Sequence, residues 1–522
     1  MPGSRTSIVF VGFMGAGKTT AARAVARVLD ADFIDTDELI SRETGESIAD
    51  FFATQGEARF REIEERIVLE SLARRGAVVA LGGGAIESDA IRASLIDQAL
   101  ADNVTVWCQV EVDEAWERAS GTARPLATDR DAFRRRFAAR EPLYRSVSRV
   151  ILPGGGDEFG AIVAPWLGAL RTLPSVALTW ARSANGSYPV AIGPDAGSML
   201  VAEGGPRIGS RRFVVADRIA LREAGRLLPD LGTRTFEVEG GELAKTLAAA
   251  ERLLGELARA GVRRDDALVA FGGGVAGDLV GFCASVYQRG VPVAQIPTTL
   301  VAQVDSAYGG KTGVDLAEAK NYVGTYHQPA AVLADPDALG SLPRAELAAG
   351  FAEVVKTALI AGGPLWDRVR AIEELTVDAV VPLVFDCART KIEIVAADER
   401  DEGRRAVLNL GHTVGHAIEA ASGYGRYRHG EAVALGLLAA LRLSGADGLR
   451  DEVAELFGRA GLPLQLDPAV DVEAVVAATA RDKKRTVEGI GFVLLSRPGA
   501  AAHDQRIDAD SLRAVVEELA PR

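Results

Sequence analysis

Apolar runs that end in glycine-rich turns recur along this 522-residue chain. Residues 7–13 form the first run, and an alanine-rich stretch up to residue 29 follows its glycine turn. Residues 77–81 form a second run that leads into three glycines, and residues 267–271 form a third that leads into another glycine turn. Short apolar runs bounded by glycine are typical of buried strands. The pattern predicts buried strands that lead through tight turns into helices.

The chain has no long flexible tether between its predicted elements. A short stretch near residues 172–175 contains a proline and separates two patterned halves, and no Gly/Ser-rich or Pro-rich linker occurs there. Length alone suggests about three or four domains. We therefore expect several domains, with a boundary near residue 172.

Composition and charge are those of a soluble globular protein. Apolar residues make up 48% of the chain and charged residues 25%, and the net charge of −13 disfavours non-specific nucleic-acid binding. Cys108, Cys283 and Cys387 lie too far apart for a Cys-x-x-Cys motif. No stretch approaches the ~20 apolar residues that span a bilayer, and the first apolar run is too short for a targeting segment. We expect a cytoplasmic enzyme without nucleic-acid or membrane partners.

The first glycine turn matches the pattern G-x-x-x-x-G-K-[ST] through Gly12, Gly17, Lys18 and Thr19. Such glycines let backbone amides close around phosphate oxygens at a helix N-terminus. The lysine then reaches the terminal phosphates, and the hydroxyl of Thr19 faces Mg²⁺. The plainer alternative is a tight strand-to-helix turn with an exposed lysine. The strand before the loop and the helix after it favour the phosphate site.

Charged side chains follow at the ends of later elements. Asp35 and Asp37 lie two residues apart after a short apolar run, so they face the same side of an extended chain. Taken singly, these features have ordinary explanations, because acidic pairs cap helices, glycine triplets form turns and arginines cover solvated faces. The same part of the chain also contains Arg61 and Arg140 in predicted helices, Gly82–Gly84 after a predicted strand, and Arg124 in a predicted loop.

The order and spacing of these motifs resemble shikimate kinase from residue 1 to about residue 172. The strings GxxGxGKT, D-T-D, G-E-x-x-F-R, G-G-G, R-P-L and R-x-x-L-Y all occur in sequence. The resemblance implies phosphoryl transfer from ATP to shikimate by positioning and electrostatics. It assigns Lys18, Asp37 and Arg124 to catalysis; Gly12, Gly15, Ala16, Gly17, Lys18, Thr19 and Thr20 to ATP; Thr19 and Asp35 to Mg²⁺; and Asp37, Arg61, Gly83, Gly84 and Arg140 to shikimate.

A second glycine turn carries Gly272, Gly274 and Gly277 in G-x-G-x-x-G spacing. After a strand and at the start of a helix, this spacing indicates a dinucleotide pyrophosphate site, although a packed glycine turn is the plainer alternative. Further along, Lys311 and Lys320 lie in a glycine-rich region. Lysines among glycines indicate anion binding, and a solvated loop is the default alternative.

Three of the chain's five histidines, His412, His416 and His429, fall within eighteen residues. His412 and His416 are four apart and share one face of a helix, and the absence of the H-E-x-x-H glutamate argues against a zincin protease. Upstream, Glu353 and Lys356 are three apart on a predicted helix, where a surface ion pair is the ordinary interpretation. The histidine cluster by itself indicates a metal site with an open choice of reaction.

Together these features resemble 3-dehydroquinate synthase over residues 176–522. The strings GGGVxGDLxGF, PTTL, GGKTGV, AEVVK, LNxGHTxGHA and HGEAV occur in order. The resemblance implies NAD and Zn²⁺ (or Co²⁺) as cofactors. It assigns Glu353, His412 and His429 to the metal; Asp305, Lys311, Lys356, Asn409 and His416 to catalysis; Glu242, Lys245, Gly274, Val275, Gly277, Asp278, Thr298, Thr299, Lys311 and Lys320 to NAD; and Arg289, Asn321, Lys391, Arg405 and one of Lys483 and Lys484, with Lys484 preferred, to substrate.

The resemblances imply an α/β protein with three domains. Residues 1–172 would form a P-loop kinase, in which helices cover both faces of a parallel sheet. Residues 176–330 would form an α/β NAD-binding domain, and residues 331–522 a mainly helical domain that binds the metal and the substrate. The family also suggests a homodimer through the synthase half.

The implied function is bifunctional. One half would phosphorylate shikimate at its 3-hydroxyl, and the other would convert 3-deoxy-D-arabino-heptulosonate 7-phosphate into 3-dehydroquinate and phosphate. Two alternatives stay open. The second half could be a sister sugar-phosphate cyclase, or the first half could be a nucleotide-binding module without catalytic activity.

Overall fold

The computed structural model describes residues 6–99, 103–121, 126–183, 186–316, 320–401, 403–479, 485–486 and 489–521. The chain divides into two compact units. The first unit contains Met1–Trp180 and Pro189–Arg207, and the second contains Ala181–Tyr188 and Ile208–Arg522.

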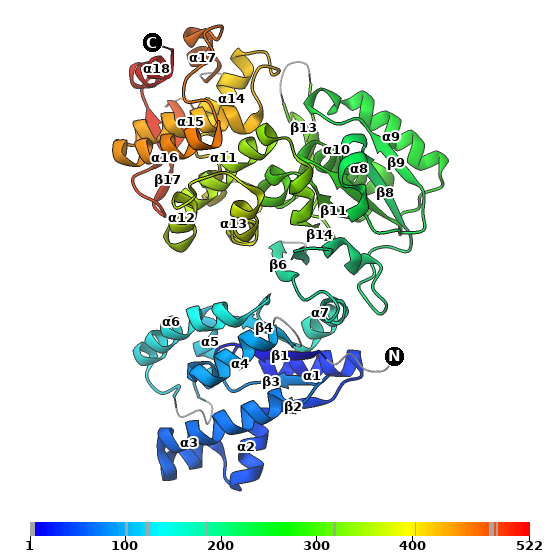
Figure 1. Cartoon of the computed structure of the whole chain (residues 1–522), viewed down its shortest axis with the longest axis vertical. Coiled ribbons are helices and arrows are strands. Elements are labelled where there is room, and N and C mark those ends of the chain that lie inside the picture. Colours follow the sequence, from blue (N-terminus) through cyan, green and yellow to red (C-terminus); the bar gives the residue numbers. More distant parts are fainter. Residues whose placement is uncertain are drawn as a thin grey trace. The chain divides into compact units, whose positions relative to one another are not determined.

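A parallel sheet forms the centre of the first unit (Figure 1). Its strands pair in the order β2-β3-β1-β4-β5, so β1 has a neighbour on each side. Ile8, Val9 and Phe10 of β1 have no solvent exposure, as expected for a strand covered on both faces. The elements are β1 (Ser7–Val11), α1 (Lys18–Leu29), β2 (Phe33–Asp35), α2 (Thr36–Thr44), α3 (Ile48–Leu72), β3 (Val78–Ala80), η1 (Ala85–Glu87), α4 (Asp89–Ala99), β4 (Asn103–Gln109), α5 (Val112–Ala119), α6 (Arg130–Val147), β5 (Val150–Pro153), α7 (Asp157–Leu170) and η2 (Ala196–Leu200).

A second set of parallel strands, in the order β14-β11-β10-β8-β9, lies in the second unit. Helix α10 packs on it through Leu279, Val280 and Cys283, which share a buried cluster with residues of β8 and β10. β14 continues this sheet beyond residue 330 by pairing with β11. The elements are β8 (Arg212–Asp217), α8 (Arg218–Ala224), β9 (Thr235–Val238), η4 (Glu242–Ala244), α9 (Leu247–Arg259), β10 (Ala267–Gly272), α10 (Gly274–Val286), η5 (Tyr287–Arg289), β11 (Val293–Pro297), the π-helical turn η6 (Ala302–Ser306), the hairpin strands β12 (Lys311–Val314) and β13 (Val323–Tyr326), and β14 (Ala331–Ala334).

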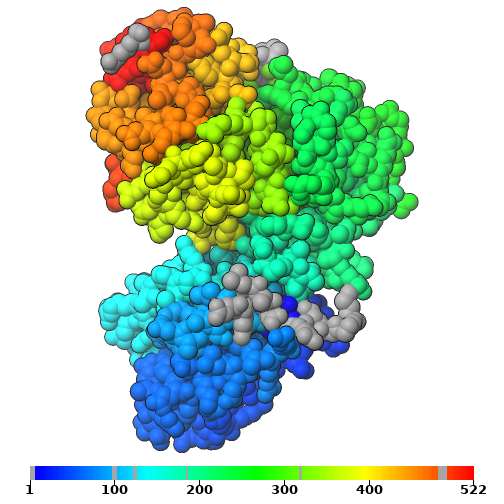
Figure 2. All heavy atoms as spheres, viewed as in Figure 1, coloured from blue at the N-terminus to red at the C-terminus, as the bar shows by residue number. Residues whose placement is uncertain are grey.

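Helices dominate the rest of the second unit. In Figure 2 the atoms of its sheet part (green) and of its helical part (yellow to orange) meet along one surface. A small antiparallel sheet, β15-β16-β17, accompanies these helices. The elements are η7 (Pro336–Ser341), α11 (Arg344–Ala361), α12 (Gly363–Arg370), α13 (Val377–Ala397), η8 (Arg404–Asn409), α14 (His412–Ala421), α15 (His429–Leu443), α16 (Asp447–Ala460), α17 (Val472–Thr479), β15 (Arg485–Thr486), β16 (Gly489–Leu495), β17 (Ala501–Ile507) and α18 (Ala509–Glu518).

These observations confirm the predicted fold class. Parallel strands with helices come first, and a further set of parallel strands with helices, followed by a mainly helical region, comes second. The small antiparallel sheet near the C-terminus is an element that the sequence pattern did not predict. None of the helices in the described part of the chain is long and apolar enough to cross a membrane.

Two candidate active sites

The loop between β1 and α1 has the strained backbone that a phosphate-binding loop requires. Gly12 has φ +145°, and a Cβ atom there would lie 2.6 Å from the carbonyl oxygen of Cys108. Gly17 has φ +78° at the N-cap of α1, and its Cβ would lie 2.8 Å from the carbonyl oxygen of Gly155. Side chains are excluded at both positions by strain and by space. The backbone can therefore approach a ligand closely at the N-terminus of α1.

The two residues expected to hold Mg²⁺ lie side by side at the end of β2. The hydroxyl of Thr19 donates to Oδ2 of Asp35 at 2.9 Å. The other oxygen of Asp35 caps α2 by accepting from the backbone amides of Asp37 and Glu38. A hydroxyl and a carboxylate are the oxygen ligands that Mg²⁺ prefers. The arrangement fits the metal, with Lys18 at the adjacent helix start.

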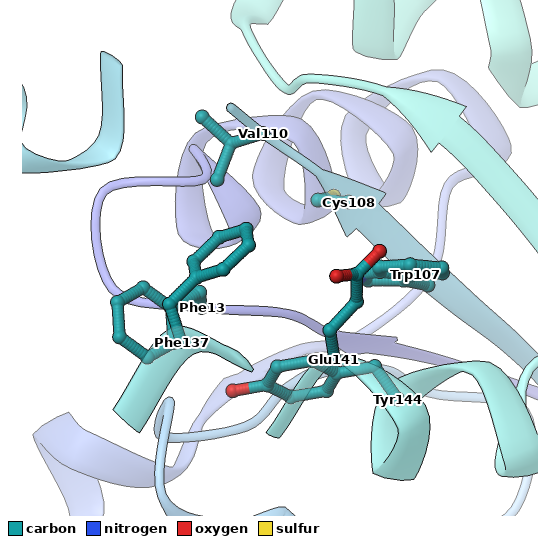
Figure 3. Close-up of a pocket in the computed structure, with 7 residues that line it drawn as sticks. All are labelled: Phe13, Trp107, Cys108, Val110, Phe137, Glu141 and Tyr144. Atoms are coloured by element: carbon teal, nitrogen blue, oxygen red, sulfur yellow. The ribbon is translucent and has the colours of Figure 1, made fainter. Parts of the chain in front are cut away.

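Arg140 is buried and has several protein partners, which is unusual for an arginine. Its exposed fraction is 1%, its Nη1 donates to the carbonyl oxygen of Gly83 at 3.2 Å, and its guanidinium lies 5.8 Å from the ring centre of Phe13. Figure 3 shows Phe13 beside Phe137 and Tyr144 of α6, and these aromatic side chains line a pocket. The hydroxyl of Tyr144 also donates to the carbonyl oxygen of Gly83, at 2.5 Å. Arg140 is thus fixed in place before any substrate arrives.

Arg61 lies next to the same glycine turn. It pairs with Glu64 at 2.6 Å and with Glu57 at 2.9 Å. A Cβ atom on Gly84 would fall 2.1 Å from Nη1 of Arg61, so only glycine leaves room for the guanidinium. Burial raises the pKa of the Glu64 carboxyl, and Arg61 offsets only part of that increase.

The structure therefore brings most of the predicted acceptor residues around one turn. A Cβ atom on Gly82 would lie 2.6 Å from Oδ1 of Asp37 and equally close to Oε1 of Glu64, which places Asp37 on this turn as well. Glu64 was not among the residues predicted from the sequence. Its position three residues after Arg61, one helical turn away, was the available signal. Arg124 lies outside the described residues.

In the second unit, the turn between β10 and α10 is packed against its neighbours. Gly272 has φ +156°, and its Cβ would lie 2.7 Å from Cβ of Ala276. Gly274, Val275 and Gly277 follow in the first turn of α10. Thr298 donates its amide to the carbonyl oxygen of Gly272 at 2.9 Å, and the side chain of Thr299 lies beside Gly273. The predicted dinucleotide turn and both threonines therefore lie together at the start of α10.

Lys245 is the centre of a buried polar group next to this turn. It contacts Oδ2 of Asp278 and Oδ1 of Asn321, both at 2.5 Å. Glu242 lies 3.9 Å from both Lys245 and Lys320. Burial lowers the pKa of the Lys245 ammonium, but Asp278 and Glu242 outweigh burial and raise it overall. Four of the predicted NAD residues thus lie together, and Asn321, predicted for substrate, lies among them.

Close helix packing brings the predicted metal ligands together. A Cβ atom on Gly430 would lie 1.9 Å from the carbonyl oxygen of Ala349, and one on Gly436 would lie 2.0 Å from that of Gly411. These glycines let α15 approach both α11 and α14. Glu353 on α11 and His429 on α15 therefore meet the start of α14, where His412 lies.

Oε1 of Glu353 lies 3.5 Å from Nε2 of His412 and 3.4 Å from Nε2 of His429. Ligands about 2.0–2.1 Å from one tetrahedral zinc ion stand roughly 3.3–3.4 Å apart, so these spacings fit a single metal. Burial holds the pKa of His412 well below its usual value, and the pKa of Glu353 is also well below its usual range, because Lys356 and His412 outweigh its burial. The neutral imidazole and the carboxylate are the forms that bind metals.

His416 also belongs to this cluster. One nitrogen from each of His412, His416 and His429 lies within 4.8 Å of the other two. The rings of His412 and His416 meet edge to face, with their centres 5.2 Å apart. His416 is exposed. A proton-handling or substrate-binding role remains the prediction for it.

Glu419 is a site residue that the sequence reasoning missed. Its exposed fraction is 2%, and its Oε2 lies 3.2 Å from Nδ1 of His429, while Lys320 donates to its Oε1 at 3.0 Å. Burial raises the pKa of the Glu419 carboxyl, but His429 and Lys320 outweigh burial and bring it to about 2. A carboxylate behind a metal-binding imidazole orients the ring. The i, i+4, i+7 spacing of His412, His416 and Glu419 on α14 was the signal for it.

A chain of alternating charges extends from the metal cluster. Lys356 contacts Oε2 of Glu353 at 2.6 Å and Oδ1 of Asp305 at 3.6 Å, and Lys391 contacts Oδ2 of Asp305 at 2.9 Å. Burial raises the pKa of the Asp305 carboxyl, but Lys356 and Lys391 outweigh burial and bring that pKa to about 2. Both lysines are buried. They form a cationic wall suited to an anionic substrate.

The remaining predicted residues have other partners in this structure. Lys311 pairs with Asp401 at 2.6 Å, Asn409 donates to the carbonyl oxygen of Ala406 at 3.1 Å, and Arg405 is buried and donates to the carbonyl oxygen of Gly309 at 3.2 Å. Arg289 is exposed, and we find no contact among the described residues that joins it to the charged chain. Lys483 and Lys484 lie outside the described residues.

Comparisons with known proteins match both units. A family model for shikimate kinase matches residues 14–167. Models for the N-terminal and C-terminal parts of 3-dehydroquinate synthase match residues 235–349 and 350–485. The 3-dehydroquinate synthase of Symbiobacterium thermophilum is 43% identical over 314 residues, which cover 58% of this chain and 86% of that protein.

Solved structures resemble the synthase part. A 2-deoxy-scyllo-inosose synthase complexed with carbaglucose-6-phosphate, NAD⁺ and Co²⁺ superposes with a TM-score of 0.59 at 25% identity, over 66% of this chain and 100% of that one. The 2-epi-5-epi-valiolone synthase of Streptomyces hygroscopicus, with NAD⁺ and Zn²⁺ bound, gives a TM-score of 0.58 at 26% identity, over 64% of this chain and 96% of that one.

The fold, the sites and these comparisons define a bifunctional enzyme that combines a kinase with a lyase. The chain belongs to the shikimate kinase family in its first unit and to the 3-dehydroquinate synthase family in its second. The resemblances inferred from the sequence motifs are thereby confirmed.

Proposed function

We propose that the first unit transfers the terminal phosphoryl group of ATP, with Mg²⁺, to the 3-hydroxyl of shikimate. Thr19 and Asp35 would hold the magnesium ion, and Lys18 would neutralise charge on the phosphates. Asp37 would accept the proton of the attacking hydroxyl, and Arg61 and Arg140 would bind the carboxylate. Arg124 would act from the loop over the site. The 2.9 Å contact of Thr19 with Asp35 at the end of the glycine loop carries this proposal.

We propose that the second unit converts 3-deoxy-D-arabino-heptulosonate 7-phosphate into 3-dehydroquinate and phosphate. The observation that carries this proposal is the convergence of His412 and His429 on one oxygen of Glu353. Lys356 and Asp305 join this cluster to Lys391, and the two lysines would hold the anionic groups of the substrate.

Bound NAD⁺ would supply a transient oxidation at C5 of the substrate, and a bound divalent metal would withdraw charge from the reacting oxygens, which together would make the neighbouring C–H more acidic. The residues of the chain position the substrate for this chemistry. Glu353, His412 and His429 would hold the metal, and the glycine turn with Lys245 and Asp278 would hold the dinucleotide. His416 would carry the proton near the metal. Arg289, Lys311, Asn321, Arg405, Asn409 and Lys484 complete the proposed substrate and catalytic set.

Three domains and a dimer belong to the same proposal. Residues 1–172 would be the kinase, residues 176–330 the NAD-binding domain, and residues 331–522 the metal- and substrate-binding domain. The glycine turn at α10 and the metal cluster on α11, α14 and α15 lie in different parts of the second unit, which supports separate NAD-binding and metal-binding domains. Two copies of the chain would associate through the synthase half.

A sister sugar-phosphate cyclase is the second candidate for this unit. The two solved structures are of such enzymes, and they contain NAD⁺ with Co²⁺ or Zn²⁺. The higher identity to 3-dehydroquinate synthases favours the first candidate.

A product assay separates the two candidates. Metal-stripped protein is incubated with NAD⁺ and the heptulosonate phosphate, with and without Zn²⁺, and the product is identified by NMR. We expect zinc-dependent release of phosphate and formation of 3-dehydroquinate. No turnover with this substrate, but turnover of another sugar phosphate, would support the sister-cyclase function.

Glu419 gives a prediction that does not depend on activity. Glu419→Gln keeps the shape of the side chain but removes the charge that faces His429, so we expect zinc affinity to fall by about 10- to 100-fold. Competition with a chromogenic chelator measures the affinity. The matched control is Glu431→Gln, which removes an acid on α15 that pairs with Arg428 instead. Equal zinc affinity in the two variants would contradict a positioning role for Glu419.

A further inference from the structure

Both arginines that are proposed to bind the substrate carboxylate already face a carboxylate of the protein. Oε2 of Glu87 lies 2.6 Å from Nη2 of Arg140 and 3.6 Å from Nη2 of Arg61. Glu87 ends the short turn η1, which follows the glycine triplet directly. Its side chain is 41% exposed, whereas that of Arg140 is 2% exposed. A partly solvated acid therefore bridges a buried cation and its neighbour.

Glu87 accepts from only one of the donor nitrogens of the Arg140 guanidinium. Nη2 binds Glu87 and Nη1 binds the carbonyl oxygen of Gly83, but Nε is buried, and we find no hydrogen-bond partner for it among the described residues. Nε and Nη2 form one edge of the guanidinium, and a carboxylate can accept from both at once. A buried donor left without a partner costs free energy. The edge formed by Nε and Nη2 of Arg140, of which Glu87 contacts only Nη2, could therefore bind a second carboxylate through both nitrogens.

We infer that Glu87 occupies the subsite for the acceptor's carboxylate in the free enzyme, and that its displacement sets the affinity and the specificity of the kinase for acidic acceptors. This inference rests on the proposed kinase function. An incoming carboxylate that used Nε and Nη2 of Arg140 together would replace the single contact of Glu87. Glu87 would then turn toward solvent, which it already reaches. An acceptor without a carboxylate could not displace it in this way.

The charges around the subsite determine how strongly Glu87 competes with a substrate carboxylate. Arg61 also pairs with Glu57 and Glu64, so its charge is already balanced without Glu87. Arg140 has Glu87 as its ion-pair partner among the described residues. A substrate carboxylate that arrived while Glu87 stayed in place would face a like charge, which is unfavourable in a partly buried site.

Glu87→Gln tests the inference by direct binding of shikimate, measured calorimetrically. Because the amide carries no charge to compete for Arg140, we expect shikimate to bind roughly three- to tenfold more tightly than to the wild type, the range of a partly exposed ion pair. The matched control, Glu57→Gln, removes an equal charge from Arg61 without touching Arg140, and we expect less than a twofold change. The methyl ester of shikimate, which lacks the carboxylate charge, should gain nothing from Glu87→Gln.

Each other outcome has a distinct meaning. Unchanged shikimate binding in Glu87→Gln, beside normal binding by the wild type, would overturn the inference. Weaker binding would overturn it too, because Glu87 would then be a residue that positions Arg140. Tighter binding of the ester as well as of the acid would also count against competition between carboxylates. If the wild type itself does not bind shikimate, the proposed acceptor is wrong and the inference falls with it. Thermal unfolding of each variant confirms that the fold is intact.

Discussion

His412→Ala is expected to abolish zinc-dependent synthase activity and to weaken zinc binding by more than about 100-fold, the upper end of what loss of an outer partner alone costs. His412 supplies one of the two imidazole nitrogens that converge on Oε1 of Glu353. Removal of one of the three proposed protein ligands would leave the proposed zinc site with two. Zinc affinity is measured by chelator competition, and the synthase rate by phosphate release.

Two variants serve as controls for this result. His503→Ala removes a partly exposed imidazole on β17, which pairs with Asp504, and it should leave both readouts unchanged. His416→Ala should retain most of the zinc affinity but lose synthase activity, because His416 is proposed to handle a proton. Loss of zinc from His416→Ala together with retention by Glu353→Ala would instead show that the three histidines hold the metal.

Kinase activity provides an internal standard in the same samples. The phosphate loop and the metal cluster lie in different compact units. His412→Ala should therefore keep the wild-type rate of shikimate phosphorylation. A parallel loss of kinase activity would show that the variant is misfolded or that the two sites are coupled.

The fold could be predicted from the sequence because its glycine turns have few structural solutions. Gly12 and Gly272 have backbone conformations that other residues rarely adopt, and each lies between a buried strand and a helix. Such a pattern predicts parallel α/β structure from local information alone. The β15–β17 sheet has no comparable marker in the sequence, and β16 packs against α15, which lies far from it along the chain.

The candidate sites were only partly predictable, for a different physical reason. Sequence motifs identify residues that belong to a recognisable pattern, such as Lys18 in the glycine loop or His412 in the histidine cluster. Glu87 and Glu419 are ordinary acids in the sequence, and their importance comes from the partner that the fold places beside them. Lys311 shows the converse, because its motif is clear but its ammonium pairs with Asp401 in this structure. Side-chain partners between distant segments depend on tertiary packing, which spacing along the chain does not reveal.

Lys18→Ala is expected to lower the rate of shikimate phosphorylation by on the order of 10²–10³, the cost of removing one preorganised charge donor from a transition state. Lys18 begins α1 directly after the positive-φ residue Gly17. In this structure its ammonium donates to the carbonyl oxygen of Phe13 at 3.1 Å, so it lies along the glycine loop, where a nucleotide's phosphates would be bound. The rate is measured by coupling ADP release to a spectrophotometric assay.

The control for Lys18 is Arg23→Ala, which removes another cation from α1. Arg23 is exposed and pairs with Glu38, so the kinase rate should stay within about twofold of the wild type, as for an exposed ion pair. The synthase rate should be unaltered in both variants. If Lys18→Ala phosphorylates shikimate as fast as Arg23→Ala, the glycine loop is not where the transferred phosphoryl group lies. If the wild type binds ATP but phosphorylates no shikimate, the acceptor assignment fails while the loop keeps its role in nucleotide binding, because the loop geometry and the acceptor arginines are separate parts of the site.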